Sequence, residues 1–287
     1  MNIFIALDNP RILERYVRVA GGRFRPLSAL IATNYIGKLF DIFVKLKAKG
    51  KLDKLFLDSG TFTRNQEGRG PDNDHDFELY MDMIERIGKE FDLIAAYDVD
   101  FRDPKRNQHF YFEMLRRLQG TGIEKRVVPV MHDSVKPGDE FDLYAGAGAE
   151  VIAIGSTPPL SVAQWKLLNR KRFWSGVEIH MMGNLGAPLL KAKKPEYADS
   201  ARFAHDAKYG DICVWNPVTM NLNRVHVTNS DEYTDEVREF VMSTFGFTPA
   251  DLMADVTNKW IVNLFGINQM QDFLTNEWYP NNWVKDW

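Results

Sequence analysis

The chain has 287 residues, of which 45% are hydrophobic and 13% aromatic, enough for a substantial core in one large α/β domain. Its net charge of −3 excludes a uniformly basic nucleic-acid-binding protein, so a polyanionic partner would have to meet local basic patches. The single cysteine, Cys213, excludes an internal disulfide and a multi-cysteine zinc site, and it suits a reducing cytoplasm. No apolar run reaches the roughly 18 residues of a membrane span, so none is expected.

Short apolar runs bounded by Gly, Pro or acidic residues predict strands, and helical patterns separate most of them. The expected strands begin near residues 2, 54, 93, 126, 151, 177, 197 and 211. The expected helices cover residues 27–49, 76–91, 104–118, 138–147, 161–172 and 187–194. Residues 11–25 read as a basic insert, and Pro129 predicts an irregularity inside the strand that begins near 126.

This alternation predicts an α/β fold, an irregular (β/α)8 TIM barrel with a helical C-terminal extension. The connection between the last two expected strands is too short for a standard helix, which makes the barrel irregular there. A doubly wound sheet is the alternative, but no Gly-rich dinucleotide loop or Walker loop follows any strand. The expected organisation is a catalytic barrel at 1–230 and an aromatic-rich helical extension at 231–287 packed on it.

Polar and small residues end most of the expected strands, and a barrel brings these strand ends together at one rim. The set consists of Asp58, Asp98, Asp100, His132, Gly155, Ser156, Met182, Gly183 and Asp199. Each has an ordinary alternative, since a strand-end Asp often caps a helix and a strand-end His is often a buried structural group. Carboxylates that converge at a rim repel one another, however, so acids from three strands indicate a substrate, proton or metal between them.

Two carboxylates on opposite sides of a pocket suit glycosidic chemistry. One attacks the anomeric carbon, and the other handles the proton on the leaving group. Asp98 beside Tyr97 suits a purine-like base, because carboxylate oxygens accept hydrogen bonds from ring N–H groups. Glycines such as Gly155 and Gly183 would let a flat ring approach the backbone, and Phe62 and Tyr97 are candidates to stack on it, although aromatics at strand ends more often belong to the core.

In their order along the chain, these motifs resemble the tRNA-guanine transglycosylases and their relatives that insert 7-deazaguanines into DNA. The similar pieces are Leu57-Asp58-Ser59-Gly60-Thr61-Phe62, Tyr97-Asp98, Val130-Met131-His132, Ala153-Ile154-Gly155-Ser156, His180-Met181-Met182-Gly183 and Tyr197-Ala198-Asp199-Ser200. The resemblance implies that Asp199 is the nucleophile and Asp58 the general acid/base. The base-binding residues that it implies are Asp98, Tyr97, His132, Gly155, Ser156, Met182, Gly183, Ser59 and Phe62.

The chain also departs from this family. The tRNA enzymes hold a structural zinc with three cysteines and a histidine, which a chain with one cysteine cannot supply. His132 stands where the family has Gln, and Ser156 where it has Gly, so the identity of the base stays open. The shorter chain and its helical, aromatic tail are more similar to the compact, phage-type DNA deazaguanine transglycosylases. The resemblance therefore implies exchange of guanine in DNA for a free 7-deazaguanine such as preQ0, through an aspartyl-glycosyl intermediate and without cofactor or metal.

A nucleic-acid substrate needs phosphate contacts, and its target base must be flipped out or presented single-stranded. Charge runs are most often solvated faces, but some of the basic clusters flank the strand that carries Asp199. The candidate contacts are Lys166, Arg170, Lys171, Arg172, Lys191, Lys193 and Lys194.

Three alternative functions stay open from the sequence. The first is a transglycosylase that acts on RNA. The second is a metal-dependent barrel hydrolase that uses Asp98, Asp100, His132 and His180, although the His-x-His pair usual in such barrels is absent. The third is a non-catalytic nucleic-acid-binding protein, which the presence of both Asp58 and Asp199 disfavours.

Overall fold

The computed structural model describes nine stretches of the chain: residues 1–7, 9–20, 26–60, 73–99, 103–155, 159–183, 186, 189–190 and 193–278. Of the residues singled out above, Phe62, Asp100, Ser156 and Lys191 lie outside these stretches. No helix among the described residues has the length and apolar character needed to cross a membrane.

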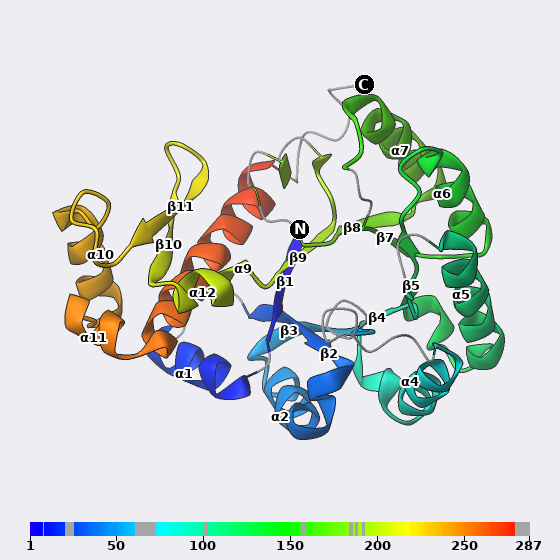
Figure 1. Cartoon of the computed structure of the whole chain (residues 1–287), viewed down its shortest axis with the longest axis horizontal. Helices are drawn as coiled ribbons and strands as arrows, with labels where there is room; N and C mark the ends of the chain where they lie inside the picture. The colour runs from blue at the N-terminus through cyan, green and yellow to red at the C-terminus, as the bar shows by residue number, and fades with distance from the viewer. Residues whose placement is uncertain are drawn as a thin grey trace.

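Parallel strands close into a barrel around the centre of the molecule (Figure 1). The strands are β1 (Asn2–Ala6), β2 (Leu27–Ala32), β3 (Leu52–Asp58), β4 (Leu93–Ala95), β5 (Val127–Val128), β6 (Val130–Met131), β7 (Val151–Ile154), β8 (Glu178–Met181) and β9 (Tyr197–Ser200). Their hydrogen-bonded order is β5-β4-β3-β2-β1-β9-β8-β7-β6. Pro129 interrupts one strand into β5, which pairs with β4, and β6, which pairs with β7, so this divided strand closes the barrel. The expected barrel and its irregularity at Pro129 are confirmed.

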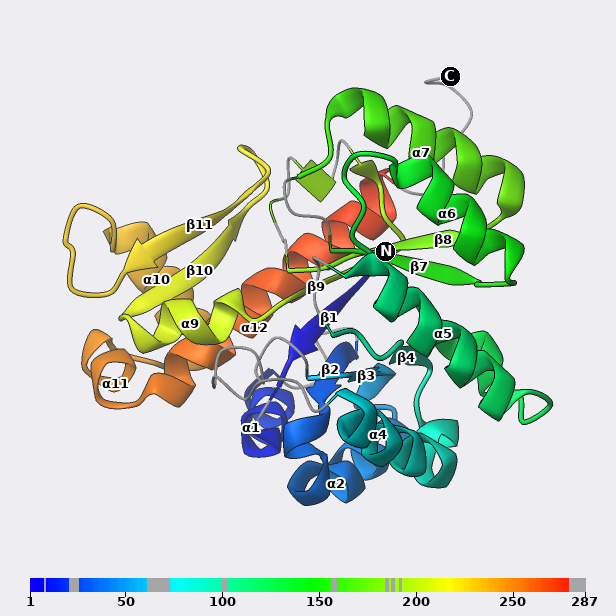
Figure 2. The ribbon, with the colours of Figure 1, turned by 45° about the vertical axis from the view of Figure 1, so that its right-hand side comes forward.

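Helices cover the outside of the barrel (Figure 2). Each of them comes after a barrel strand in the chain, and the strands end together at one rim. They are α1 (Pro10–Ala20), α2 (Ile36–Ala48), α4 (Asn73–Ile87), α5 (Pro104–Leu118), α6 (Pro137–Gly146), α7 (Val162–Ser175) and α9 (Arg202–Lys208). Local sequence sets their ends. In α7, Ser161 and Gln164 form a reciprocal capping box, and Gly176 ends the helix in the left-handed conformation at φ 73°.

Two of the elements expected near the N-terminus were wrong. Residues 11–25 were read as an insert, but α1 occupies most of this stretch and packs Ile12, Leu13 and Tyr16 into the core. The single helix expected at 27–49 is instead β2, a short 3-10 turn and then α2. The apolar run from Leu27 fits either element by composition, and β2 is a strand because β1 and β3 pair with it on both sides.

The expected eighth barrel strand near residue 211 was also wrong. β10 (Asp211–Asn216) pairs only with β11 (Asn221–His226), antiparallel, in a separate sheet. This hairpin lies beside the barrel with α10 (Asp235–Phe245) and α11 (Pro249–Ala254), as both views show (Figures 1 and 2). The eighth barrel strand is β2, which the sequence analysis had assigned to a helix.

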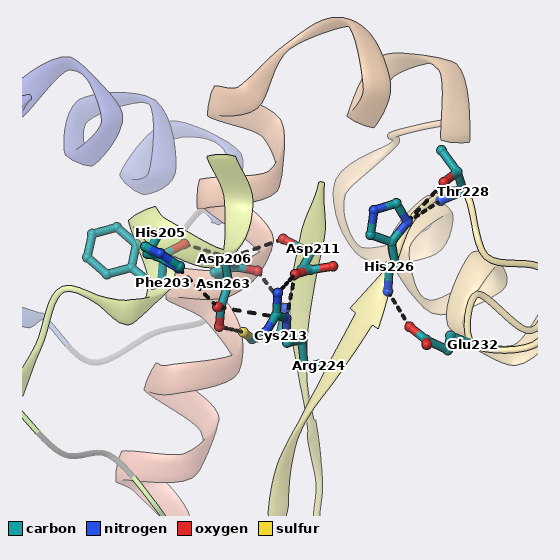
Figure 3. A network of polar contacts seen from close by, with 10 residues as sticks. All are labelled: Phe203, His205, Asp206, Asp211, Cys213, Arg224, His226, Thr228, Glu232 and Asn263. Carbon is teal, nitrogen blue, oxygen red and sulfur yellow. Dashed lines mark hydrogen bonds and ion pairs between the residues drawn. The ribbon is translucent and has the colours of Figure 1, made fainter. Parts of the chain in front are cut away.

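The helix α12 (Val256–Phe273) joins the hairpin to the barrel. Its Asn263 side chain accepts a hydrogen bond from the Cys213 amide on β10 (2.6 Å) and donates one to the Phe203 carbonyl on α9 (2.8 Å) (Figure 3). Toward its C-terminus, the Gln271 side chain accepts a hydrogen bond from the Ile3 amide on β1 (2.8 Å). α12 therefore covers the barrel where its first and last strands meet, which is the place of the eighth helix.

The barrel interior changes in character from its floor to its rim. The strand registers arrange the inward side chains in layers taken from alternate strands. A lower layer holds Phe4, Phe56, Val128 and His180, and the layer above it holds Leu30, Ala95, Ala153 and Asp199. Large rings thus fill the floor, while alanines dominate around Asp199. This contrast places the polar chemistry above a closed, apolar base.

Candidate active site

Asp199 is held by two hydrogen-bond donors near the end of β9. Its Oδ2 lies 2.6 Å from Nε2 of His180 on the neighbouring strand β8. Its Oδ1 accepts a hydrogen bond from the backbone amide of Gly183, just after β8, at 2.9 Å. Both oxygens of the carboxylate are therefore oriented by β8, and the Asp199 side chain retains 12% exposure toward the rim.

A second carboxylate–imidazole pair lies after β4 and β6. Oδ2 of Asp98 is 2.6 Å from Nε2 of His132. Burial lowers the pKa of His132, while the hydrogen bond and the negative charge of Asp98 raise it, and the net result is a raised pKa. His132 therefore holds its proton more readily than a free histidine, which makes the pair a donor as well as an acceptor of hydrogen bonds.

Glu140 fixes the loop that carries His132. Its Oε2 accepts hydrogen bonds from the amides of His132 (3.0 Å) and Asp133 (2.7 Å), and its Oε1 accepts one from the Tyr144 hydroxyl (3.3 Å). Burial raises the pKa of Glu140, and these donors oppose that effect. The sequence analysis did not single out Glu140, because a Glu in the first turn of a helix ordinarily caps that helix.

The strand β7 separates the two carboxylate–imidazole pairs. It ends at Gly155, where a Cβ atom would lie 3.1 Å from Cγ1 of Val130 and 3.3 Å from Cε1 of His132. Any larger residue would therefore press on the imidazole that binds Asp98. The small residue Ala153 precedes Gly155 on the inner face of the same strand. The inner face of β7 thus carries only small groups at its end, and the Val130 and His132 side chains lie directly over Gly155.

Asp58 ends β3 at the same rim, and its Oδ2 accepts a hydrogen bond from the Gly60 amide at 3.1 Å. Gly60 has a positive φ of 74°, and a Cβ there would lie 2.7 Å from Oγ1 of Thr33. The same Thr33 hydroxyl donates to the Ser59 carbonyl at 3.0 Å, and Ser59 is only 4% exposed. The structure therefore gives Ser59 and Gly60 a clear part in shaping the turn that presents Asp58.

The structure places Tyr97 away from the rim. Its ring is 1% exposed and packs outward against the rings of Phe77, Tyr80 and Phe110 on α4 and α5, with centroids 5.2 to 5.8 Å away. Its stacking faces are thus covered by the core, which corrects its assignment to base binding. Met182, by contrast, packs against the cluster inside the barrel, beside the turn that contains Gly183.

Arg172 is likewise a structural residue. It is 4% exposed, and its Nη1 donates to the Lys194 carbonyl (3.0 Å) and lies 3.3 Å from Oε2 of Glu196. Burial raises the pKa of Glu196, and the charge of Arg172 opposes this. A phosphate cannot reach a guanidinium enclosed in this way, so the assignment of Arg172 as a backbone contact is corrected.

Most other candidate phosphate contacts lie far from the strand ends. Helices of a (β/α)8 barrel run antiparallel to the strands, so the C-terminal half of α7, with Arg170 and Lys171, lies toward the end opposite the rim. Lys171 also pairs with Asp142 on α6 at 2.5 Å. The ammonium of Lys193 lies 4.3 Å from the centre of the Trp165 ring. Lys166, one turn into α7 and exposed, is the candidate closest to the rim along that helix.

The metal-hydrolase alternative finds no donor set in the described part of the chain. No three His, Cys, Asp or Glu side chains are grouped there in a way that could hold a metal ion. His132 and His180, which that alternative would use together, bind different aspartates on opposite sides of β7.

Comparisons with known proteins bear on the fold. No protein family and no characterised protein matches the chain by sequence. Among solved structures, an inferred fructose-1,6-biphosphate aldolase from Coccidioides immitis is similar with a TM-score of 0.55 and 13% identity, covering 94% of this chain and 89% of that one. The YdjI aldolase from Escherichia coli K12 has a TM-score of 0.50 and 12% identity, covering 94% and 90%. A probable tagatose 6 phosphate kinase from Sinorhizobium meliloti 1021 has a TM-score of 0.50 and 10% identity, covering 96% and 87%. At these identities the likeness concerns the fold alone, and the chain is an α/β barrel of the (β/α)8 kind.

Proposed function

We propose that this protein is a base-exchange transglycosylase that replaces guanine in DNA with a 7-deazaguanine such as preQ0. The observation that supports this most is the placement of two carboxylate–imidazole pairs on either side of β7, at the rim of the barrel. One pair supplies a nucleophile and the other supplies hydrogen bonds to a base, and β7, with its small residues Ala153 and Gly155, lies between them.

Asp199 and Asp58 divide the chemistry in this proposal. The Asp199 carboxylate attacks C1′ of the target nucleotide, and the bond between C1′ and the guanine nitrogen breaks with its electron pair passing to the base. Protonated Asp58 gives its proton to the departing guanine, and an aspartyl-glycosyl ester remains. The incoming 7-deazaguanine then loses a ring N–H proton to the Asp58 carboxylate and attacks C1′. The ester bond breaks, which restores Asp199 and leaves the new base in the strand.

Strand order supports this division. The strands β2 and β1 separate β3 from β9, so Asp58 and Asp199 reach the rim from different sides of the barrel. A sugar between them could meet the nucleophile on one face and the proton donor near the departing base.

Asp98, His132 and the β7 turn form the proposed base site. The Asp98 carboxylate accepts from the ring and exocyclic N–H groups of a guanine-like base, and His132 orients that carboxylate. Gly155 allows the His132 imidazole to lie close to the end of β7, and Met182 and Gly183, just after β8, border the site. DNA is proposed as the polymer on the resemblance to the compact DNA enzymes, with the target base flipped out of its stack.

Incubating the purified protein with labelled preQ0 and separate pools of DNA and tRNA tests this function. The expected result is label in DNA, lost in Asp199→Ala and reduced at least about 100-fold in Asp58→Ala. Asp53→Ala is the matched control, because Asp53 is an exposed acid on β3 at the end opposite the rim. Incorporation by Asp199→Ala at the wild-type rate would show that the nucleophile is misassigned. Label in tRNA alone would change the polymer, and no label in either pool would refute the exchange activity.

A further inference from the structure

His180 lies directly beneath the proposed nucleophile and out of reach of solvent. Its side chain is 0% exposed, and its ring is stacked on Phe4, with centroids 5.8 Å apart and an interplanar angle of 18°. Phe56 meets it edge to face at 4.9 Å, and the Tyr197 ring, which also contacts Phe4, lies 6.3 Å away. Rings from three strands therefore hold the imidazole in one orientation.

The two nitrogens of this imidazole have different surroundings. Nε2 points to Oδ2 of Asp199 at 2.6 Å. Nδ1 is buried, and no described residue lies within hydrogen-bonding distance of it. An imidazolium would place a charged N–H at Nδ1 among aromatic rings without an acceptor, which is costly. A neutral ring protonated at Nε2 instead has its one donor satisfied by the carboxylate.

We propose that His180 is a positioning residue: a neutral imidazole, protonated at Nε2, that orients the Asp199 carboxylate without neutralising its charge. Together with the Gly183 amide on Oδ1, it donates one hydrogen bond to each carboxylate oxygen and so fixes the plane of the group. Each oxygen keeps a further lone pair for attack on carbon. An ion pair with a protonated histidine would withdraw charge from the nucleophile, whereas a neutral donor leaves it on the oxygens. The kinetic consequence rests on the proposed transglycosylase function, but the protonation state does not.

The protonation state can be measured without substrate. In ¹⁵N-labelled wild-type protein, side-chain NMR at neutral pH is expected to show His180 protonated at Nε2 and unprotonated at Nδ1. The Nε2 signal is expected to shift in Asp199→Ala, which removes the acceptor and assigns the resonance. A doubly protonated ring, or a proton on Nδ1 alone, would overturn the proposal. Because this measurement uses wild-type protein, it decides the question even where a variant fails to fold.

The kinetic readout uses two replacements of His180. His180→Phe keeps a ring between Phe4 and Phe56 but removes the donor, and it is expected to lower kcat about 10- to 100-fold with KM for the free base within about twofold. His180→Gln offers an amide N–H at similar reach and is expected to restore kcat to within about fivefold of wild type.

Tyr197→Phe is the matched control, because it keeps the ring beside His180 and removes only a hydroxyl. That hydroxyl donates to Glu178 at the barrel floor and does not contact Asp199. A kcat of His180→Phe within twofold of wild type would overturn the positioning role, as would an equal loss in His180→Phe and His180→Gln. A wild-type protein that incorporates no base would refute the proposed function instead. The NMR result would still decide whether a neutral imidazole orients Asp199.

Discussion

Replacing Gly266 with Ala tests the packing of the hairpin on α12, the part of the fold that departs most from the sequence-based expectation. A Cβ at residue 266 would lie 2.4 Å from the carbonyl oxygen of Cys213 on β10 and 3.0 Å from Cδ1 of Leu222 on β11. The first distance is about 1 Å short of the separation at which such atoms attract. The substitution therefore requires β10 and α12 to move apart.

Two effects of opposite sign determine the free energy of unfolding of this variant. Ala in place of Gly inside a helix stabilises by about 1 kcal/mol when nothing lies near its methyl group. Overpacking of a rigid contact costs about 1–3 kcal/mol, and the upper part of this range applies because the Cys213 backbone is held by Asn263 at 2.6 Å. The expected result is a net loss of about 1–2 kcal/mol, or roughly 2–4 °C in Tm for each kcal/mol.

Urea unfolding followed by circular dichroism measures the difference, with Gly37→Ala as the control. Gly37 is in α2 with nothing within 4 Å of its would-be Cβ, so this variant is expected to be as stable as wild type or more stable by up to about 1 kcal/mol. The reasoning would be refuted if Gly266→Ala equalled or exceeded wild type in stability, since β10 could not then lie against α12 as described.

Three further predictions concern the rim and the buried ion pair. Burial lowers the pKa of His132 and Asp98 raises it, and the net result is a raised pKa. The pair therefore adds stability below about pH 6.5, and this stability is lost as the pH rises through the higher pKa of the folded protein. Urea unfolding between about pH 5.5 and 8.5 should show the loss in wild type and not in His132→Gln. Arg172→Ala should lower the free energy of unfolding by about 3 kcal/mol, because Glu196 stays buried without its cation. DNA titration of the folded variant should show unchanged affinity. Weaker DNA binding at unchanged stability would instead support a phosphate-binding role for Arg172. Gly155→Ala should raise KM for the free base about 10-fold, because its methyl group would press on the His132 imidazole 3.3 Å away and so shift Asp98. An unchanged KM in the folded variant would argue against a base bound beside β7.

The barrel was predictable because its strands carry their own signal. Seven of the eight barrel strands are apolar runs that end in Asp, His, Gly or Met, and such runs are typical of buried parallel strands. Strand ends share a rim, so the candidate acids Asp58, Asp98 and Asp199 followed from the strand assignment alone. The irregular strand at Pro129 followed from the missing amide of proline.

The errors arose where one local pattern suits two structures. Leu27–Ala32 has an apolar composition that fits a helix or a strand, and only pairing with both β1 and β3 makes it β2. Residues 211–216 do form a strand, but no local signal specifies its partner. The strand was expected to pair within the barrel, and it pairs with β11 instead. The close approach of Gly266 to Cys213, 53 positions earlier in the chain, determines where this strand packs.

Side-chain roles at the rim depended on tertiary structure in the same way. The sequence specified the chemical groups at the strand ends, because residue type and strand position are local properties. It could not specify which imidazole binds which carboxylate: His180 meets Asp199 from 19 residues away, and His132 meets Asp98 from 34. It also could not show that Tyr97 faces the helices or that Arg172 is enclosed by Glu196, since burial is a property of all the elements that surround a side chain. Contacts between distant segments decided these roles, and they form only when the barrel closes.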